Sequence, residues 1–445
     1  SVPTHINDDT PTITGNAEAN SSVELFDGTT SIGTANANGS GVWSITSSQL
    51  SNAAHTLTAK ATDAAGNTSA ASSGVTTTVD TQAPSAPTFV SPPSLTKSST
   101  PTLEGTAEAG SLVELFNGAV SLGVATAASD GTWSITASSL SDGDYSLTLK
   151  TTDAAGNVSA ASTAHSLKVD TTPATVSAVA IDAADESTYD VLNAGDKVTF
   201  KVTMSEAVVL TAAPDKTNAE SLTLDVQIGS QLVEAQYEST SSNELVFSYI
   251  ILDGQTDANG IAIPVNPLNL LSGSTLKDLA GNDATITFAS PVTDDSDYRV
   301  DTSTPNAPVF SSLAAAINQK KPTIQGTSEP NATIELYEGS TLLGSAQADG
   351  SGNWSVTTSA TLQDGSHTIA AKAIDAAGNM SSLSSTVTTL IDTVAPTVQS
   401  RTANTGVSVI TINTSEPLVG TPPASAFSVK LTNSSTTTLT PTAVS

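Results

Sequence analysis

The chain has 445 residues, more than a single hydrophobic core supports, so several domains are expected. Its 43 acidic and 14 basic residues give a net charge of −29, which argues against nucleic acid and anionic membrane surfaces as partners and favours divalent cations. Cysteine is absent, which excludes disulfide-stabilised domains, and no apolar run approaches the roughly 18 residues of a membrane span. No signal-peptide pattern is present at Ser1, and the chain starts inside one repeat and stops inside another, so we expect a piece of a longer protein whose targeting signals lie elsewhere.

Three landmarks recur at an interval of 90 residues, which indicates tandem repeats. They are a tryptophan, an aspartate that begins an Asp-Ala-Ala-Gly-Asn stretch, and an aspartate that begins a Thr-rich linker. The pairs are Trp43 and Trp133, Asp63 and Asp153, and Asp80 and Asp170. The third tryptophan, Trp354, follows Trp133 by 221 residues, so a longer module is expected between the second and third copies.

The second copy shows the strand pattern clearly. Short runs of β-forming residues, some with strict alternation of apolar and polar side chains, are separated by turn signals such as Asn117-Gly118. The expected strands lie at 101–108, 112–116, 121–126, 131–136, 145–151 and 166–169. A unit of about seven such strands predicts an antiparallel sandwich of immunoglobulin type.

The predicted fold class is all-β, with tandem immunoglobulin-like antiparallel sandwiches placed end to end as an extended rod. Three repeats are expected at 1–80, where the N-terminal linker is shortened, at 81–170 and at 302–392. Residues 171–301 lack the tryptophan and predict a larger variant sandwich with an extra hairpin. Residues 393–445 are expected to form part of a module of that larger kind, because Ser415-Glu-Pro417 parallels Ser205-Glu-Ala207.

The motifs of the three repeats support a family resemblance. They run Thr-Pro-Thr-x-x-Gly-Thr-Ala-Glu, Val-Glu-Leu-Phe-Asn-Gly, Gly-Thr-Trp-Ser-Ile-Thr, Asp-Ala-Ala-Gly-Asn and Val-Asp-Thr-x-x-Pro. This series resembles the bacterial Ig-like repeats of giant, type I secreted, RTX-type adhesins. The resemblance implies an extender region on the bacterial cell surface, with calcium ions at the domain borders and with the adhesion target bound by other regions of the parent chain.

Consecutive antiparallel strands alternate in direction, so their loops lie alternately at the two ends of a sandwich. Counting strands in this way places several acidic loops of each domain at the end where the chain enters, next to the linker aspartate that precedes the domain. The convergence of several carboxylates is unfavourable without a cation, and oxygen ligands in sets of about six to eight suit Ca²⁺. Zinc and copper are not favoured, because cysteine is absent and the four histidines are scattered. The candidate ligands, junction by junction, are Asp80, Glu108, Asp130 and Asp153; Asp170, Glu206 and Asp278; Asp301, Glu329, Asp349 and Asp375; and Asp392 and Glu416.

Alternatives to these metal sites remain open at this point. Asp-x-Ala-Gly-Asn is also a good tight turn, and Glu108 and Glu329 are also consistent with solvated loop acids. An acidic loop at 253–260 offers a further cation site, although it lacks the glutamate that an EF-hand needs, and the acidic run 294–297 is a candidate addition to the Asp301 junction.

No nucleophile elbow, phosphate loop or histidine metal spacing occurs, so no enzyme is expected. The tryptophans share one repeat position in an alternating strand and are expected in the core rather than as sugar platforms. The predicted function is a calcium-rigidified extender of a bacterial adhesin, which projects a binding tip for adhesion or biofilm formation. The alternative is a ligand-binding module in which 171–301 recognises a glycan or a protein.

Overall fold

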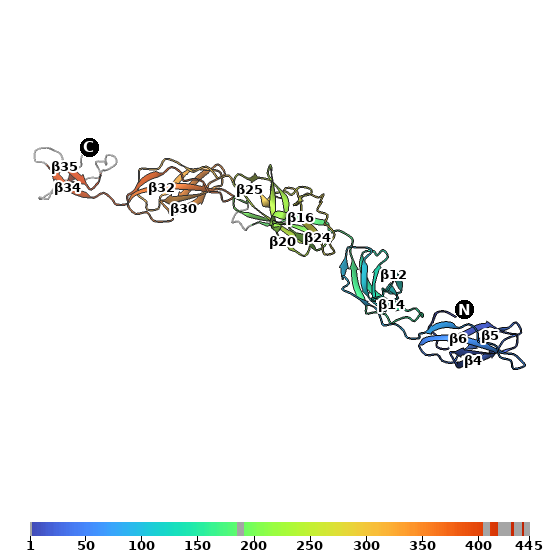
Figure 1. Ribbon diagram of the computed structural model, residues 1–445. Coiled ribbons are helices and arrows are strands. Elements are labelled where there is room, and N and C mark those ends of the chain that lie inside the picture. The colour runs from blue at the N-terminus through green and yellow to red at the C-terminus, as the bar shows by residue number, and fades with distance from the viewer. Residues whose placement is uncertain (1, 185–190, 404–409, 417–428, 431–437, 440–445) are drawn as a thin grey trace.

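The computed structural model describes residues 2–184, 191–403, 410–416, 429–430 and 438–439. Strands dominate these residues, and the helical elements are α1 (Asn218–Ser221) and the short 3-10 helix η1 (Ser296–Tyr298). Figure 1 shows groups of strands that follow one another in one extended, slightly bent line, with the two termini at opposite ends. The predicted all-β array of sandwiches is therefore confirmed. None of the described helices has the length or apolar character of a bilayer-spanning segment.

The second repeat consists of two sheets that share one core. Its strands are β8 (Thr88–Phe89), β9 (Leu95–Thr96), β10 (Thr102–Thr106), β11 (Leu112–Asn117), β12 (Val120–Thr126), β13 (Thr132–Thr136), β14 (Gly143–Thr152) and β15 (His165–Val169). One sheet has the order β12-β11-β14-β15-β9, and the other has the order β13-β10-β8. Alternate residues of β14 point inward, so Leu147 and Leu149 are fully buried between the sheets. This is an immunoglobulin-like sandwich.

The first and third repeats have the same plan. The first contains β1 (His5–Ile6), β2 (Thr12–Asn16), β3 (Ser22–Asp27), β4 (Thr30–Asn36), β5 (Val42–Thr46), β6 (Ala53–Thr62) and β7 (Val75–Val79). The third contains β26 (Val309–Phe310), β27 (Ala316–Ile317), β28 (Thr323–Thr327), β29 (Thr333–Glu338), β30 (Thr341–Gln347), β31 (Asn353–Thr357), β32 (Gly365–Ile374) and β33 (Val387–Ile391). In the first repeat the smaller sheet has only β2 and β5 among the described residues, whereas its counterpart in the third repeat has the order β26-β28-β31.

The entering segment of the second repeat is the part of this domain that the sequence did not reveal. It is split in two: β8 pairs antiparallel with β10 in the smaller sheet, and β9 pairs parallel with β15 in the larger one. Pro92 and Pro93 lie between the halves and interrupt strand pairing, because proline has no N–H to donate. Each half has two residues, too few for a readable alternation.

The repeat tryptophans lie in the cores, as predicted. Trp133 is 3% exposed, and its ring lies over Gly105 so closely that a Cβ there would meet it at 2.5 Å. Phe89 packs against this ring edge-on at 5.9 Å, and Phe310 packs against Trp354 in the same way at 5.6 Å. These contacts hold the entering strand to the core in both repeats.

Residues 171–301 form the large module. Its strands are β16 (Val176–Ala184), β17 (Lys197–Met204), β18 (Val208–Thr211), β19 (Leu222–Ile228), β20 (Gln231–Ser241), β21 (Glu244–Ile250), β22 (Thr256–Asp257), β23 (Leu268–Leu270), β24 (Thr275–Asp278) and β25 (Val300–Asp301). Its main sheet has six strands in the order β16-β17-β21-β20-β19-β23, and β18 pairs with β24 apart from it. The core is built around Phe200 and Phe247, which are fully buried.

The last segment starts with a contact that the large module also contains. Its described strands are β34 (Val398–Ala403), β35 (Ile410–Thr414), β36 (Val429–Lys430) and β37 (Thr438–Leu439). The N–H of Thr397 donates to Ser415 Oγ at 2.9 Å, and the Ser415 N–H donates to the Thr397 carbonyl at 2.8 Å. Thr175 and Ser205 exchange the same two hydrogen bonds. The Ser-Glu motif thus has one local structure in both modules.

Candidate metal centre

The Asp-Ala-Ala-Gly-Asn stretch forms a closed turn. In the second repeat it follows β14, and Asp153 Oδ1 accepts hydrogen bonds from the N–H groups of Ala155 and Asn157 at 2.8 and 2.9 Å. Gly156 has a φ of +92°, a conformation that glycine adopts without strain. Partial burial opposes ionisation of Asp153, but the hydrogen bonds from Asn157 and Ala155 outweigh it and lower the pKa of this carboxyl. The motif therefore forms a turn, whether or not it also binds a cation.

The asparagine of this turn joins each domain to the linker before it. Nδ2 of Asn157 donates both to Asp153 Oδ2 and to the backbone carbonyl of Asp80, each at 2.8 Å. Asn282 donates in the same way to the carbonyl of Asp170 at 2.8 Å. The equivalent bond in the third repeat runs from Asn379 to the carbonyl of Asp301, at 2.7 Å. The predicted meeting of linker aspartates with these turns is therefore confirmed at three junctions.

A second contact crosses two of these junctions. Lys97, just after β9 of the second repeat, donates its Nζ to the carbonyl of Gly281 in the turn of the large module, at 3.1 Å. Asn193 of the large module donates its Nδ2 to the carbonyl of Ala377 in the third repeat, at 2.7 Å. Consecutive domains are thus held by direct hydrogen bonds on two sides of the linker.

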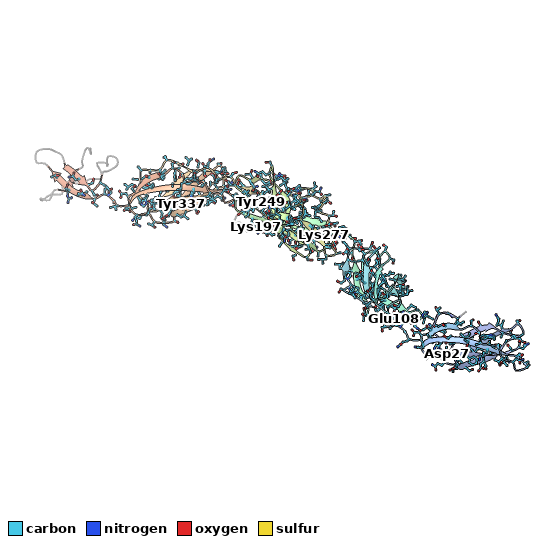
Figure 2. The ribbon with its side chains drawn as sticks, in the orientation of Figure 1. Asp27, Glu108, Lys197, Tyr249, Lys277 and Tyr337 are labelled. Atoms are coloured by element: carbon cyan, nitrogen blue, oxygen red, sulfur yellow. The ribbon has the colours of Figure 1, made fainter. Side chains whose placement is uncertain are left out.

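Three carboxylates converge where the second repeat meets the large module. Asp170, Glu206 and Asp278 each place an oxygen within 4.8 Å of the others, and we call this group the second-junction cluster. Asp170 follows the last strand of the second repeat, whereas the other two belong to the large module. The pairing of Val208 with Asp278 brings the Ser-Glu motif beside the end of β24. Lys277, labelled in Figure 2, marks this end of the large module.

The electrostatics of the second-junction cluster are unfavourable for three negative charges. Partial burial of Glu206 raises the pKa of its carboxyl group, and repulsion from Asp170 and Asp278 is the next largest cause. Asp142 lies close enough to add to this repulsion. One cation offsets it in part, since Lys168 Nζ lies 3.4 Å from Asp170 Oδ2. The cluster retains an excess of negative charge.

The chemistry of this donor set fits a hard divalent cation. All of its ligand atoms are carboxylate oxygens, the kind that Ca²⁺ prefers, and the cluster contains no histidine. Asp278 is 3% exposed and its oxygens accept hydrogen bonds from Gly281 and Asn282, so its carboxylate is held in place. A cation bound here would offset the repulsion that, together with burial, raises the pKa of Glu206.

The last junction resembles the second-junction cluster in two of its residues. The carboxyl groups of Asp392 and Glu416 share a hydrogen bond, and partial burial together with this contact raises the pKa of Glu416. They occupy the places of Asp170 and Glu206, since Glu416 follows the serine that bonds to Thr397. Both junctions at which a Ser-Glu motif follows the linker therefore bring a linker aspartate and the glutamate of that motif together.

The junctions that lead into the second and third repeats are different. Glu108, Asp130, Glu329 and Asp349 lie in exposed loops at the predicted end of their domains, and Figure 2 shows Glu108 where the second repeat faces the first. Among the described residues no group of three carboxylates forms at either junction. Asp130 Oδ1 instead accepts two hydrogen bonds from Thr132, which lower the pKa of this carboxyl. As calcium ligands these four acids stay predictions.

The comparisons with known proteins agree with this architecture. The family described as bacterial Ig-like domain matches residues 3–81, 90–171 and 311–393, more than half of the chain. The chain belongs to this family.

The relatives of this bacterial Ig-like chain include parts of larger proteins. Chitinase A1 of Niallia circulans is 42% identical over 124 residues, a match that covers 26% of this chain and 17% of the chitinase. The chain thus spans less than a fifth of that relative. Among solved structures, a tetra-tandem repeat in the extending region of a large adhesion protein is 18% identical, with 87% of this chain and 96% of that one covered and a TM-score of 0.30. Invasin, a bacterial integrin-binding protein, is 12% identical, with 87% and 77% covered and a TM-score of 0.33.

One acidic position near the Ig-like junctions, Asp142 in the second repeat and Asp364 in the third, was missed from the sequence. Asp142, in the loop before β14, accepts hydrogen bonds from the N–H and Oγ1 of Thr171 in the linker, at 2.9 and 2.7 Å. Asp364 holds Thr393 at the last junction, whereas the first junction has the neutral Asn52 at this place. The sequence signal that could have revealed this position is the Asp-Gly pair that precedes the long strand in the second and third repeats. It was missed because this loop lies at the opposite end of the domain from the acidic loops that were predicted to bind calcium.

The acidic loop at 253–260 has a structural role in the large Ig-like module. Asp257 is 4% exposed, and its two carboxylate oxygens accept hydrogen bonds from the N–H groups of Gly229 and Gly260 at 2.6 and 3.0 Å. Asn259 donates to Asp294, so the acidic run 294–297 is connected to this loop. These contacts hold the loop in place, and a cation site in it stays a prediction.

Proposed function

We propose that this chain is a calcium-stiffened extender of a bacterial surface adhesin, which holds a ligand-binding region away from the cell. The second-junction cluster carries the proposal, because its carboxylates come from two successive domains and remain mutually repulsive. The motif resemblance to adhesin repeats and the extended line of domains in Figure 1 support it. The chain would then act outside the cell, with other repeats of the parent protein as neighbours.

At the junction of the second repeat with the large module, hydrogen bonds and a bound cation would align the domains in different ways. Asn282 and Lys97 link the domains by hydrogen bonds that need no ion and set an approximate direction. Asp170, Glu206 and Asp278 would hold the cation, which supplies charge neutralisation and a tie between the linker and two loops of the next domain. Bending at the linker would then require these contacts to separate.

The reach of the array follows from the length of its strands. The long strand β14 has 10 residues, so with a rise of about 3.3 Å per residue and its loops each sandwich extends about 40 Å. Five domains in line therefore extend on the order of 200 Å. A stiff chain of this length separates a binding tip from a cell surface far better than a flexible chain of the same mass.

The affinity expected for such sites suits an extracellular medium. Exposed extracellular calcium modules bind with dissociation constants of roughly 0.1 to 1 mM. A calcium-rich medium would saturate them, and the low calcium of a cytosol would leave them empty. Stiffening would then take place after export.

Small-angle X-ray scattering of the whole chain tests the proposal. With millimolar calcium the maximum dimension should approach the length of the straight array, and with EGTA it should fall and the distance distribution should broaden. The double variant Glu206→Gln, Asp278→Asn should resemble the chelated chain in both conditions. Identical scattering of the wild type with and without calcium would refute the proposal, and magnesium in place of calcium controls for general ionic screening.

A further inference from the structure

One loop of each Ig-like repeat lies beside the linker that leaves the same repeat. Because the long strand runs antiparallel to the last one, with Gly143 opposite Val169, the loop before β14 lies next to the start of the linker. The last residue of this loop, which we call the clamping residue, bonds to the linker threonine that lies 29 residues later in each repeat. The pairs are Asn52 with Thr81, Asp142 with Thr171, and Asp364 with Thr393.

The clamping residue differs between the junctions in step with the Ser-Glu motif. It is an aspartate in the second and third repeats, which are followed by the motifs at 205–206 and 415–416. In the first repeat, which is followed by another plain repeat, it is the neutral Asn52. The side-chain oxygen of Asn52 accepts hydrogen bonds from the N–H and the hydroxyl of Thr81. An aspartate has a second oxygen, so it can hold a further group of the linker.

Asp142 uses both of its oxygens. Oδ1 accepts hydrogen bonds from the N–H and Oγ1 of Thr171, at 2.9 and 2.7 Å, and Oδ2 accepts one from Oγ1 of Thr172, at 2.5 Å. Thr172 in turn donates its N–H to Oδ1 of Asp170 at 3.4 Å, while Lys168 Nζ lies 3.4 Å from Oδ2. The Asp170 carboxylate therefore has a contact on each oxygen, and one of these contacts comes from a residue that Asp142 holds.

The first junction shows what this second attachment adds. Its linker has Gln82 in the place of Thr172, and Gln82 also donates its N–H to the linker aspartate, Asp80, at 3.0 Å. Gln82 has no hydroxyl, and in the described part of the chain Asn52 holds the linker through Thr81. The turn of the linker therefore forms without a second attachment. Asp142 adds a bond that fixes this turn to its own domain.

We propose that Asp142 is a positioning residue of the second-junction cluster, which orients the Asp170 carboxylate for a cation by holding Thr172. This inference rests on the proposed function, because it assigns a role toward the calcium ion of that junction. Asp142 is not itself a ligand here: its oxygens are occupied by the two threonines, and it is not among the three carboxylates that lie within 4.8 Å of one another. A ligand that is already oriented loses less conformational freedom when the cation binds, which strengthens binding.

Calcium titrations of the whole chain by isothermal titration calorimetry test this role. The binding that the double variant Glu206→Gln, Asp278→Asn removes from the wild-type isotherm belongs to the second junction. Asp142→Asn, which copies the first repeat, should retain this site and weaken it about 10-fold. Thr172→Val should weaken it at least about 3-fold, whereas Thr172→Ser, which keeps the hydroxyl, should bind like the wild type.

Two controls separate the clamp from a general effect of charge. In EGTA, the amide of Thr171 should exchange its hydrogen about 5-fold faster in Asp142→Ala than in the wild type, because its N–H loses its acceptor. Asn52→Asp adds the same charge at a junction without a Ser-Glu motif and should leave the calcium isotherm unchanged. A new calcium site in Asn52→Asp would show that the acid alone is sufficient and would overturn the proposal.

The remaining outcomes distinguish this inference from the proposed function. Unchanged calcium affinity in Asp142→Asn would overturn the positioning role and leave the proposed function intact. Weaker binding in Asp142→Asn together with wild-type affinity in Thr172→Val would mean that Asp142 acts by its charge and not through Thr172, and would also overturn the inference. If the double variant titrates like the wild type, the second junction binds no calcium, and the proposed function fails together with this inference.

Discussion

Replacement of Glu206 by glutamine should stabilise the chain in chelator and reduce the further stabilisation that calcium provides. In chelator the change removes two repulsive pairs, with Asp170 and with Asp278, whose oxygens lie within 4.8 Å. At that distance each pair contributes about 1 kcal/mol in a water-like dielectric, so the variant should be more stable by about 2 kcal/mol. With calcium the variant loses a charged ligand, and a tenfold weaker affinity would lower the stability gained from binding by about 1.4 kcal/mol.

Differential scanning calorimetry of the whole chain, in EGTA and in millimolar calcium, measures both effects. A change of about 2 kcal/mol corresponds to a Tm shift of roughly 5 to 10 °C for a domain of this size. Glu234→Gln, at an exposed position of β20, is the matched control and should change neither Tm. A variant whose Tm rises on addition of calcium by as much as that of the wild type would refute the reasoning.

The folding stability of the chain in chelator should also depend on pH, and the pKa of Glu206 gives the direction. Because folding raises the pKa of Glu206, the folded chain binds that proton more tightly than the unfolded chain. The destabilising repulsion is therefore present above the folded pKa and declines as the pH falls through it. Glu206→Gln should remove this dependence.

Three further predictions concern other contacts. Asn282→Ala removes the bond to the Asp170 linker carbonyl, so it should destabilise the junction by about 1 kcal/mol and broaden the scattering profile even with calcium. Bonds from His55 to a backbone carbonyl and to Asp27 raise the pKa of this histidine, so their contribution is complete below about pH 6.5 and is lost as the pH rises through the folded value. Thermal melts between about pH 6 and 9 should show this loss in the wild type, and His55→Tyr with Asp27→Asn, which copies the second repeat, should abolish it. Gly105→Ala places a Cβ 1.9 Å from a backbone carbonyl and should destabilise the second repeat by about 2 kcal/mol in urea, whereas Gly39→Ala, which meets nothing within 4 Å, should be neutral.

The sequence revealed the features that recur at a fixed spacing. The strands of the second repeat, the buried tryptophans and the meeting of the turns with the linkers could all be predicted, because each position is repeated and each follows from strand direction. His55 of the first repeat occupies the position of Tyr145 in the second, and one hydrogen bond explains why both residue types fit. The ring nitrogen of His55 bonds to the carbonyl of Ser51, and the hydroxyl of Tyr145 donates to the carbonyl of Ser141, in each case four residues earlier.

The differences between junctions could not be predicted from the sequence. Counting of strand directions treats all linkers alike, yet among the described residues the linker aspartate meets another carboxylate at the two junctions where a Ser-Glu motif follows it. In the second repeat Asp130 is instead held by Thr132 within its own loop. Strand direction predicts at which end of a domain a loop lies. It does not predict whether the acidic side chains of that loop point toward the junction with the next domain.

A crystal structure of the chain grown with calcium is the most direct test of the central claim. The account predicts one cation at the junction of the second repeat with the large module, about 2.3 to 2.6 Å from oxygens of Asp170, Glu206 and Asp278. A structure from saturating calcium in which these carboxylates turn apart, with no cation between them, would contradict it.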